Sequence, residues 1–445
     1  MTIQKERVED VYLSDGMKIS DLVNLDEGLI SARVISDPEI YRLEIEKIYS
    51  KVWIPVAHES EIPKPGDYVL RQIGEDQVIV ARSQKGEVHI LLNTCSHRGM
   101  AVCRADMGNS THFRCPYHGF TFKNNGELIG VPAFKEAYGE NLDFSQFGLV
   151  KARVSTCYGL IFGTFNEEAP SLDEQLGNLK WYLQMLLKHT DSGMEVVGGP
   201  QRWTLKANWK LGADNFVGDA HHTFMTHQSA IKLGIVPTGD PRFALYGVHI
   251  SCDNGNGLGL IGGPPNVEIP PYWGYPQEIV EQIERNLSPE QQSAYGRLAY
   301  FHGNIFPNMS FLNSTWVTEA GQPPGSYLTL RSWVPKGPDE IEVYAWILVQ
   351  KEAPDWWKEH ARRTYIRTFG PSGTLEQDDA EMWKNITSST RGYVASNKVT
   401  LNYRMGIDRK PERGDFQGPG TVYQGDYNEA NQLNIWRQWR KLITE

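Results

Sequence analysis

Two short segments of the chain each offer one thiolate and one imidazole. They are Cys95 with His97, and Cys115 with His118, and 17 residues lie between the two pairs. A zinc finger usually groups two cysteines in one turn and two histidines on a helix. A [2Fe–2S] cluster with two cysteines on one iron and two histidines on the other needs two loops that each supply one of each. The pattern therefore predicts such a cluster, and a zinc knuckle is the alternative.

A glycine stands close to the ligands in both segments, Gly99 in the first and Gly119 in the second. Because glycine has no side chain, the backbone at these points can approach inorganic sulfide and donate N–H hydrogen bonds to it. The two glycines favour the iron–sulfur interpretation over zinc.

A second set of acids and imidazoles lies in the segment NWKLGADNFVGDAHHTFMTH, residues 208–227. Its members are Asp214, Asp219, His221, His222 and His227. Two imidazoles and one carboxylate around an ion with open coordination positions form the facial triad of Fe(II) enzymes that activate O₂. An ideal helix would turn His222 and His227 apart by about 140°, so we expect a helix break between them. His221 and His222 point in different directions, so at most one of them can bind the same ion.

The elements that must position these residues begin with a β-rich region. Residues 69–165 consist of short β-rich runs between turn residues, among them Asn125-Gly126, a strong hairpin signal. Both cysteine–histidine segments lie in this region. We interpret it as a small antiparallel β domain over residues 51–168.

Helices and longer strands flank this domain. Helices are expected around 38–53, 181–187, 355–369 and 428–443, and neighbouring antiparallel strands at 326–334 and 340–350. A stretch rich in Gly and Pro, about 252–272, is interpreted as a long surface loop. The predicted fold class is α+β. The β domain is inserted into a larger catalytic domain, residues 1–50 and 169–445, whose antiparallel sheet is covered by helices.

Composition narrows the class of protein. A formal net charge of −10 argues against a nucleic-acid partner, which needs basic surface. No apolar run is long enough to span a membrane, and the first residues lack the apolar core of a secretory signal, so we expect a cytoplasmic protein. Five cysteines are an odd number and do not form a disulfide framework. Cys103, Cys157 and Cys252 are interpreted as small buried hydrophobic residues.

With these motifs the chain resembles the large (alpha) subunits of the Rieske non-haem iron aromatic-ring-hydroxylating dioxygenases, and most closely the naphthalene-dioxygenase-like group. CSHRGM and CPYHGF resemble the family's cluster motif, which more often ends in Trp where this chain has Phe120. The resemblance extends over nearly the whole chain. It implies two cofactors, a [2Fe–2S] cluster and a mononuclear Fe(II), with O₂ as cosubstrate.

The resemblance also assigns roles in the second set. It implies that His222 and His227 bind the mononuclear iron together with Asp379, and Asp378 beside it is the alternative. Asp219 would bridge the two metal sites by accepting hydrogen bonds from His222 and from the partner subunit's His118. Asn215 matches a family position close to the iron. His221 stands where the family often has Tyr, which leaves its role open.

The substrate pocket is also assigned by resemblance. Its predicted walls are Asn215, Phe216, Ala220, Thr223, His302, Asn304 and Phe369. Aromatic walls suit a flat ring, and a carboxylated substrate would usually need an arginine, which none of these positions supplies. We therefore expect a mono- or polycyclic aromatic hydrocarbon, hydroxylated to a cis-dihydrodiol. Aromatic carboxylates such as a phthalate remain the alternative.

Several partners are implied in the same way. They are a ferredoxin, an NADH-dependent reductase and a small beta subunit in a hexamer of three alpha and three beta subunits. The glycines of the segment 257–262 match the GxGxxG dinucleotide pattern, but Gly-Pro-Pro follows it, so no helix can begin there to hold a pyrophosphate. A pure electron-transfer Rieske protein is the alternative of another class, and it leaves His222, His227 and Asp379 unexplained.

Overall fold

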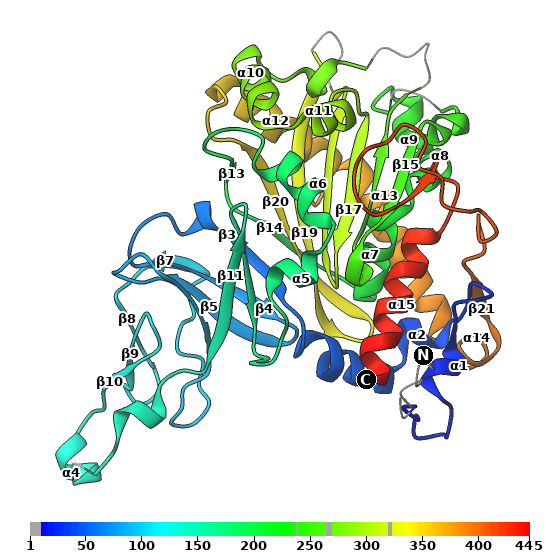
Figure 1. The fold of residues 1–445 in the computed structure, drawn as a ribbon. Helices are drawn as coiled ribbons and strands as arrows, with labels where there is room; N and C mark the ends of the chain where they lie inside the picture. The colour runs from blue at the N-terminus through cyan, green and yellow to red at the C-terminus, as the bar shows by residue number, and fades with distance from the viewer. Residues whose placement is uncertain (1–9, 140, 237–238, 264–268, 319–322) are drawn as a thin grey trace, which may run out of the picture. The chain divides into compact units, whose positions relative to one another are not determined.

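The computed structural model describes residues 10–139, 141–236, 239–263, 269–318 and 323–445 (Figure 1). Contacts between residues divide the chain into two units. The large unit consists of Met1–Ile48 with Asp173–Glu445, and the inserted unit is Tyr49–Leu172. The sequence predicts the insertion at residues 51–168. No helix within the described ranges is long and apolar enough to cross a membrane.

The inserted unit is built from antiparallel strands in two sheets. The strands are β3 (Ile54–His58), β4 (Asp67–Ile73), β5 (Asp76–Arg82), β6 (Val88–Leu92), β7 (Met107–Asn109), β8 (His112–Arg114), β9 (Thr121–Lys123), β10 (Leu128–Gly130), β11 (Lys151–Cys157) and β12 (Leu160–Thr164). Their orders are β3-β12-β11-β6-β5-β4-β7 and β10-β9-β8. The predicted hairpin at Asn125-Gly126 joins β9 to β10, with Gly126 at a φ of 88° that favours glycine. The predicted β domain is confirmed.

The large unit contains a nine-stranded antiparallel sheet with the order β13-β20-β19-β18-β17-β16-β15-β22, and β14 also pairs with β20. The strands are β13 (Met194–Val196), β14 (Gln201–Leu205), β15 (Gly247–Ser251), β16 (Gly257–Ile261), β17 (Tyr300–Ile305), β18 (Met309–Trp316), β19 (Gly325–Gly337), β20 (Glu340–Gln350) and β22 (Thr421–Gln424). The predicted strands 326–334 and 340–350 coincide with β19 and β20.

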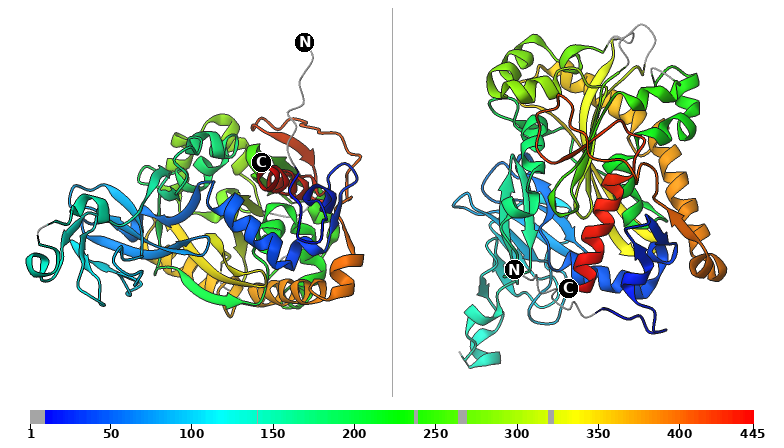
Figure 2. Two further views of the ribbon diagram at one scale, coloured as in Figure 1. Left: turned by 90° about the horizontal axis from the view of Figure 1, so that it is seen from below. Right: turned by 45° about the vertical axis from the view of Figure 1, so that its right-hand side comes forward.

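Helices pack against this sheet (Figures 1 and 2). Helix α7 (Trp209–Gly218) packs against β16, β17, β18 and β19, and the C-terminal α15 (Ala430–Thr444) packs against α7 and β15. Helix α12 (Asp355–Thr368) lies along β19 and β20, and α13 (Thr374–Thr390) packs against α12. The predicted α+β class, with an antiparallel sheet covered by helices, is confirmed.

Glycines allow α7 to approach the sheet closely. A Cβ atom on Gly212 of α7 would lie 2.4 Å from the Trp333 ring, and one on Gly257 of β16 would lie 2.9 Å from Val217 of α7. The interpretation of 252–272 as one surface loop is therefore wrong in its middle, because 257–261 form the buried strand β16. Gly257, one of the residues that suggested a loop, allows this close helix–sheet packing. Residues 264–268 of that stretch lie outside the described part.

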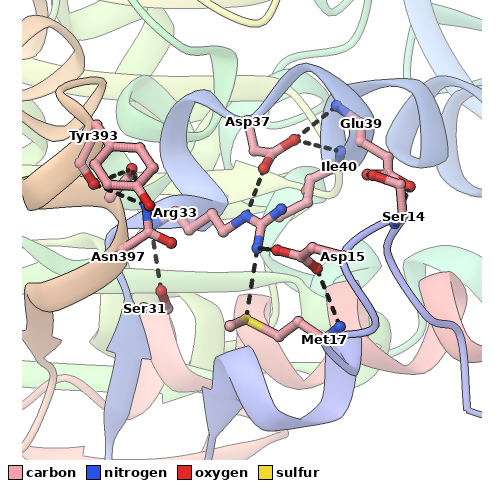
Figure 3. A network of polar contacts seen from close by, with 11 residues as sticks. Ser14, Asp15, Met17, Ser31, Arg33, Asp37, Glu39, Ile40, Tyr393 and Asn397 are labelled. Carbon is pink, nitrogen blue, oxygen red and sulfur yellow. Dashed lines mark hydrogen bonds and ion pairs between the residues drawn. The ribbon is translucent and has the colours of Figure 1, made fainter.

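Polar contacts connect the segment around Asp15 to the start of helices α2 (Arg33–Ser36) and α3 (Pro38–Glu44) (Figure 3). Arg33, in the short helix α2, donates from Nε to Asp37 at 2.6 Å and from Nη1 to Asp15 at 2.5 Å. The second oxygen of Asp37 accepts the N–H of Glu39 at 2.7 Å and so caps α3. The predicted helix 38–53 is shorter, since α3 continues only as a π-helical turn to Tyr49.

The last residue of α3, Glu44, is a fully buried carboxylate. It accepts hydrogen bonds from Lys210 Nζ at 2.5 Å, from Trp209 Nε1 at 2.8 Å and from Trp439 Nε1 at 2.8 Å. These donors stand on α7 and α15, so one side chain joins α3, α7 and α15 of the large unit. A buried charge requires such partners, because losing one of them leaves the carboxylate unpaired.

Candidate metal centres

The two cysteine–histidine loops of the inserted unit repeat the same local geometry. In the first loop, after β6, the N–H of Cys95 donates to the carbonyl of Met100 and the N–H of Gly99 donates to the carbonyl of Cys95, both at 2.9 Å. The same two bonds recur in the second loop, 20 positions later, at 2.8 and 3.0 Å. Gly99 and Gly119 have φ values of 75° and 78°, where glycine is strongly favoured.

The side chains of these loops converge in a way that fits a [2Fe–2S] cluster. Cys95 and Cys115 are buried, and the half-buried rings of His97 and His118 have centroids 4.6 Å apart. Nδ1 of His97 is buried and has no hydrogen-bond partner among the described residues. Burial raises the pKa of Cys95, and the neighbouring Cys115 raises it further. Thiolates in this place therefore need a cationic group, as the two irons of a cluster would supply.

In the large unit, three ligand atoms form an equilateral triangle. Nε2 of His222 lies 3.3 Å from Nε2 of His227, and Oδ1 of Asp379 lies 3.3 Å from each of these nitrogens. Ligands about 2.1 Å from one ion have this spacing when the angles at the ion are near 100°. The three atoms thus fit one face of a metal ion and leave the opposite face open.

The backbone brings the two histidines together through a break in the helix. Helix α7 ends at Gly218, a single turn of 3₁₀-helix covers Ala220–His222, and α8 covers Thr223–Thr226. His227 lies between α8 and α9 (Gln228–Lys232) with φ −99° and ψ 32°, outside the helical range. The predicted break is confirmed. Asp379 comes from α13 and is buried.

Hydrogen bonds to the far side of each ring fix the tautomers. Nδ1 of His222 donates to the backbone carbonyl of Asp219, and Nδ1 of His227 donates to Oδ2 of Asp378 at 3.2 Å. A metal ion in the triangle would therefore meet a lone pair on each Nε2 atom. Burial lowers the pKa of His222, yet Asp219 and Asp379 outweigh burial and raise it well above its usual value. Positive charge is favoured at this point, and a divalent cation provides it.

The neighbouring acids have distinct places. Asp378 supports His227 from behind, while Asp379 reaches the triangle, a distinction that the sequence left open. Oδ2 of Asp219 accepts from Asn215 Nδ2 at 3.2 Å and lies 3.7 Å from Nδ1 of His222. Asp214 is not part of the triangle. Burial raises the pKa of Asp214 well above its usual value.

His221 lies between two carboxylates. Its Nε2 is 3.1 Å from Oδ1 of Asp219, and its Nδ1 is 3.5 Å from Oδ2 of the fully buried Asp426. Asp426 also touches Nε2 of His249. His249, His302 and Asp426 thus form a second group of two imidazoles and one carboxylate. The direct contact between His249 and Asp426 leaves no room for an ion between them, so we interpret the group as a buried imidazole–carboxylate contact that supports His221.

Replacing His221 with Phe removes both of its polar contacts while keeping a flat ring. We expect product formation to fall by about 10- to 100-fold, the usual effect of losing an orienting partner next to a metal site. Iron content should stay unchanged, because His221 is not one of the three ligand atoms. The check is steady-state turnover alongside iron analysis, with Tyr at 221 as the conservative variant. Wild-type turnover in the Phe variant would show that Asp219 does not need His221.

A cavity opens beside the triangle. It holds about 470 Å³ of empty space, some of it open to solvent. Its walls are Asn215, Phe216, Asp219, Ala220, His222, Thr223, His227, Tyr300, His302, Leu312, Trp316, Phe369 and Asp379. A smaller space of about 280 Å³ shares Ala220, Thr223 and Tyr300 with it. Apart from the three residues of the triangle, apolar and aromatic side chains form most of the wall.

The cavity corrects the predicted walls in two ways. Asn304 is completely buried and does not line it, since its amide donates to the carbonyl of Pro307 and accepts from Ser310. Tyr300, Leu312 and Trp316 were missed. Alternation along β17 and β18 could have revealed them, because residues two apart on a strand share a face and His302 pairs directly with Leu312.

Comparison with known proteins identifies both units. Residues 52–151 match the model of the Rieske [2Fe-2S] domain, and residues 187–402 match the catalytic domain of the ring hydroxylating alpha subunit. The Rieske match decides against the zinc alternative. The catalytic-domain match decides against a pure electron carrier.

Individual relatives cover nearly the whole chain. The biphenyl 2,3-dioxygenase subunit alpha of Rhodococcus jostii (strain RHA1) is 36% identical over 96% of this chain and 91% of its own. The N,N-dimethyl phenylurea N-demethylase subunit alpha of Sphingobium sp. (strain YBL2) is 35% identical over 97% and 96%. The crystal structure of naphthalene 1,2-dioxygenase from Rhodococcus sp. bound to indole is 49% identical, with a TM-score of 0.91 over 94% of this chain and 97% of that one.

Proposed function

The chain belongs to the Rieske non-haem iron ring-hydroxylating dioxygenases as an alpha subunit, and from this premise we propose that it hydroxylates an uncharged aromatic ring with O₂ to a cis-dihydrodiol. It is an oxidoreductase that uses a [2Fe–2S] cluster and a mononuclear iron. The observation that carries the proposal is the triangle of His222, His227 and Asp379, which opens on an apolar, aromatic-walled cavity.

The proposed roles of the residues follow from the contacts above. Cys95, His97, Cys115 and His118 would hold the cluster. His222, His227 and Asp379 would hold the mononuclear iron, with Asp378 and the Asp219 carbonyl orienting the two imidazoles. When bound, the two iron groups supply the one-electron steps that O₂ needs to react with an aromatic ring.

The cavity favours an uncharged ring. Among its lining residues, all within the described ranges, neither lysine nor arginine occurs. Phe216, Leu312, Trp316 and Phe369 offer faces and edges for an aromatic substrate and exclude water from it. Burial lowers the pKa of His302 to about 4, so this ring in the wall is uncharged at pH 7. A carboxylate would find hydrogen-bond partners here but no cation.

The proposed assembly follows the family. A ferredoxin and an NADH-dependent reductase would supply electrons to the cluster. A beta subunit would complete a hexamer of three alpha and three beta subunits. Asp219 would link the two chains, because its backbone carbonyl accepts from its own His222 and its carboxylate would accept from the partner subunit's His118.

Product identification tests the proposal. The purified alpha subunit, with a beta subunit where one is found, is supplied with a surrogate ferredoxin, reductase and NADH. The panel contains naphthalene, biphenyl, phthalate and N,N-dimethyl phenylurea. We expect cis-dihydrodiols from the hydrocarbons with both oxygen atoms from ¹⁸O-labelled O₂. Oxidation confined to phthalate, or demethylation confined to the urea, would overturn the substrate class.

A further inference from the structure

A cation lies behind the cavity wall. Arg331 stands on β19 and its side chain is completely buried. Residues 331 and 333 share a face of the strand, and Trp333 meets Gly212 of α7, so Arg331 points toward the helix side of the sheet. Arg331 is not among the described residues that line the cavity. It lies directly behind two residues of the wall, Phe216 and Phe369.

Two acceptors engage the guanidinium. Nη1 of Arg331 contacts Oε2 of Glu376, which is also completely buried, and Nη2 donates to the backbone carbonyl of Phe369 at 2.5 Å. Glu376 lies on α13, one turn before Asp379. A fork with two donors in one plane fixes both position and orientation, which an ammonium group on a flexible chain does not. The guanidinium plane is therefore fixed by α13 and by the end of α12.

Two aromatic rings of the wall lie over this guanidinium. Its carbon is 4.9 Å from the ring centroid of Phe369 and 5.4 Å from that of Phe216. Both distances lie within the range of attraction between a cation and a ring face. The two rings are 6.3 Å apart and come from segments far apart in the sequence, α7 and the end of α12. One cation thus lies against both rings.

We propose that Arg331 is a positioning residue that determines substrate specificity. It holds Phe216 and Phe369 at fixed orientations, so that an aromatic substrate binds beside the iron-binding triangle in a single orientation. This inference deepens the proposed function and rests on it. The buried ion pair of Arg331 and Glu376 supports a role in specificity, because such a pair contributes little net stability relative to well-packed apolar residues. The orientations of the Phe216 and Phe369 rings, by contrast, depend on the planar guanidinium that lies against them.

Three variants separate positioning from folding. Arg331→Met alone leaves Glu376 buried and unpaired, so it is expected to destabilise the protein. The double variant Arg331→Met with Glu376→Met removes both charges and is expected to fold. Arg331→Lys keeps a charge beside Glu376 but loses the planar fork. Arg202→Lys is the matched control, since its guanidinium lies 4.7 Å from the Tyr344 ring on the same sheet but is partly exposed and outside the wall.

Two readouts are used, and one of them needs no turnover. The first is the dissociation constant of indole, measured by calorimetry on the iron-loaded enzyme without electron donor. The second is the ratio of the two regioisomeric dihydrodiols from biphenyl, together with KM and kcat. We expect the double variant and Arg331→Lys to bind indole at least fivefold more weakly. We also expect them to change the product ratio at least threefold, with KM rising more than kcat falls.

The control variant should match wild type in both readouts. Indole binding and product ratio at wild-type values in a folded double variant or in Arg331→Lys would overturn the role of Arg331. Weaker indole binding in these variants supports that role even where wild type forms no dihydrodiol, an outcome that would count against the proposed function alone.

Discussion

Replacing Asp379 with Ala is expected to abolish product formation while the cluster remains. The carboxylate supplies one of three atoms spaced 3.3 Å apart, and two imidazoles alone hold a divalent ion weakly. Iron should fall from about three atoms per chain to about two, and turnover should fall at least about 1000-fold. Iron analysis, the visible spectrum of the cluster and turnover are measured on the same preparation.

The adjacent acid provides a matched control for this experiment. Asp378 lies next in sequence but contacts His227 from behind. Asp378→Asn keeps its shape and a weaker acceptor, so iron should stay bound and turnover should fall by no more than about 100-fold. Full iron content in Asp379→Ala, or a greater loss in Asp378→Asn, would mean that the ligand assignment is wrong.

Asp219→Ala is expected to keep both metal groups and to lose turnover by at least about 100-fold. The side chain of Asp219 is not part of the triangle, so its removal leaves the three ligand atoms in place, whereas the proposed path between chains loses its carboxylate. Cluster reduction by ferredoxin should remain fast, and cluster reoxidation in the presence of O₂ and substrate should become slow. Stopped-flow absorbance of the cluster measures both steps.

Asp214, on the helix α7 that ends just before Asp219, is the control here. Asp214→Asn replaces a buried acid, whose pKa burial raises, with an amide of the same shape. It should leave cluster reoxidation near the wild-type rate. Product formation driven by hydrogen peroxide, which brings both oxygen and electrons, should survive in Asp219→Ala. Reoxidation at the wild-type rate in that variant would disprove the bridging role.

The cluster site could be predicted from local sequence because each half is a single short loop. Spacing, a glycine and flanking strands were enough to indicate Cys95, His97, Cys115 and His118. The helix break before His227 was also local, since it followed from two histidines five positions apart. The confirmed strands β19 and β20 have strong β-forming composition over their whole length.

Features that depend on contacts between distant segments could not be predicted in this way. Asp378 and Asp379 are neighbours in sequence, and only the path of α13 past the two histidines distinguishes them. Strand β16 was missed because it contains two glycines, and glycine in a sequence suggests a loop. Gly257 allows the close approach of α7, and Gly259 leaves room for His302 and His249. Arg331 gave no signal, since a single arginine in a strand is ordinarily exposed. Its partner Glu376 lies 45 positions away.

The carboxylate of Glu44 has a consequence for how the protein is made. The ribosome completes the inserted unit, Tyr49–Leu172, long before the large unit, and domains generally fold as units during synthesis. Glu44 is synthesised before the inserted unit, but its donor Trp439 lies 395 positions further along the chain. Helix α3 therefore lacks its partner on α15 while the cluster domain folds. The large unit can close around Glu44 only after Trp439 has been synthesised.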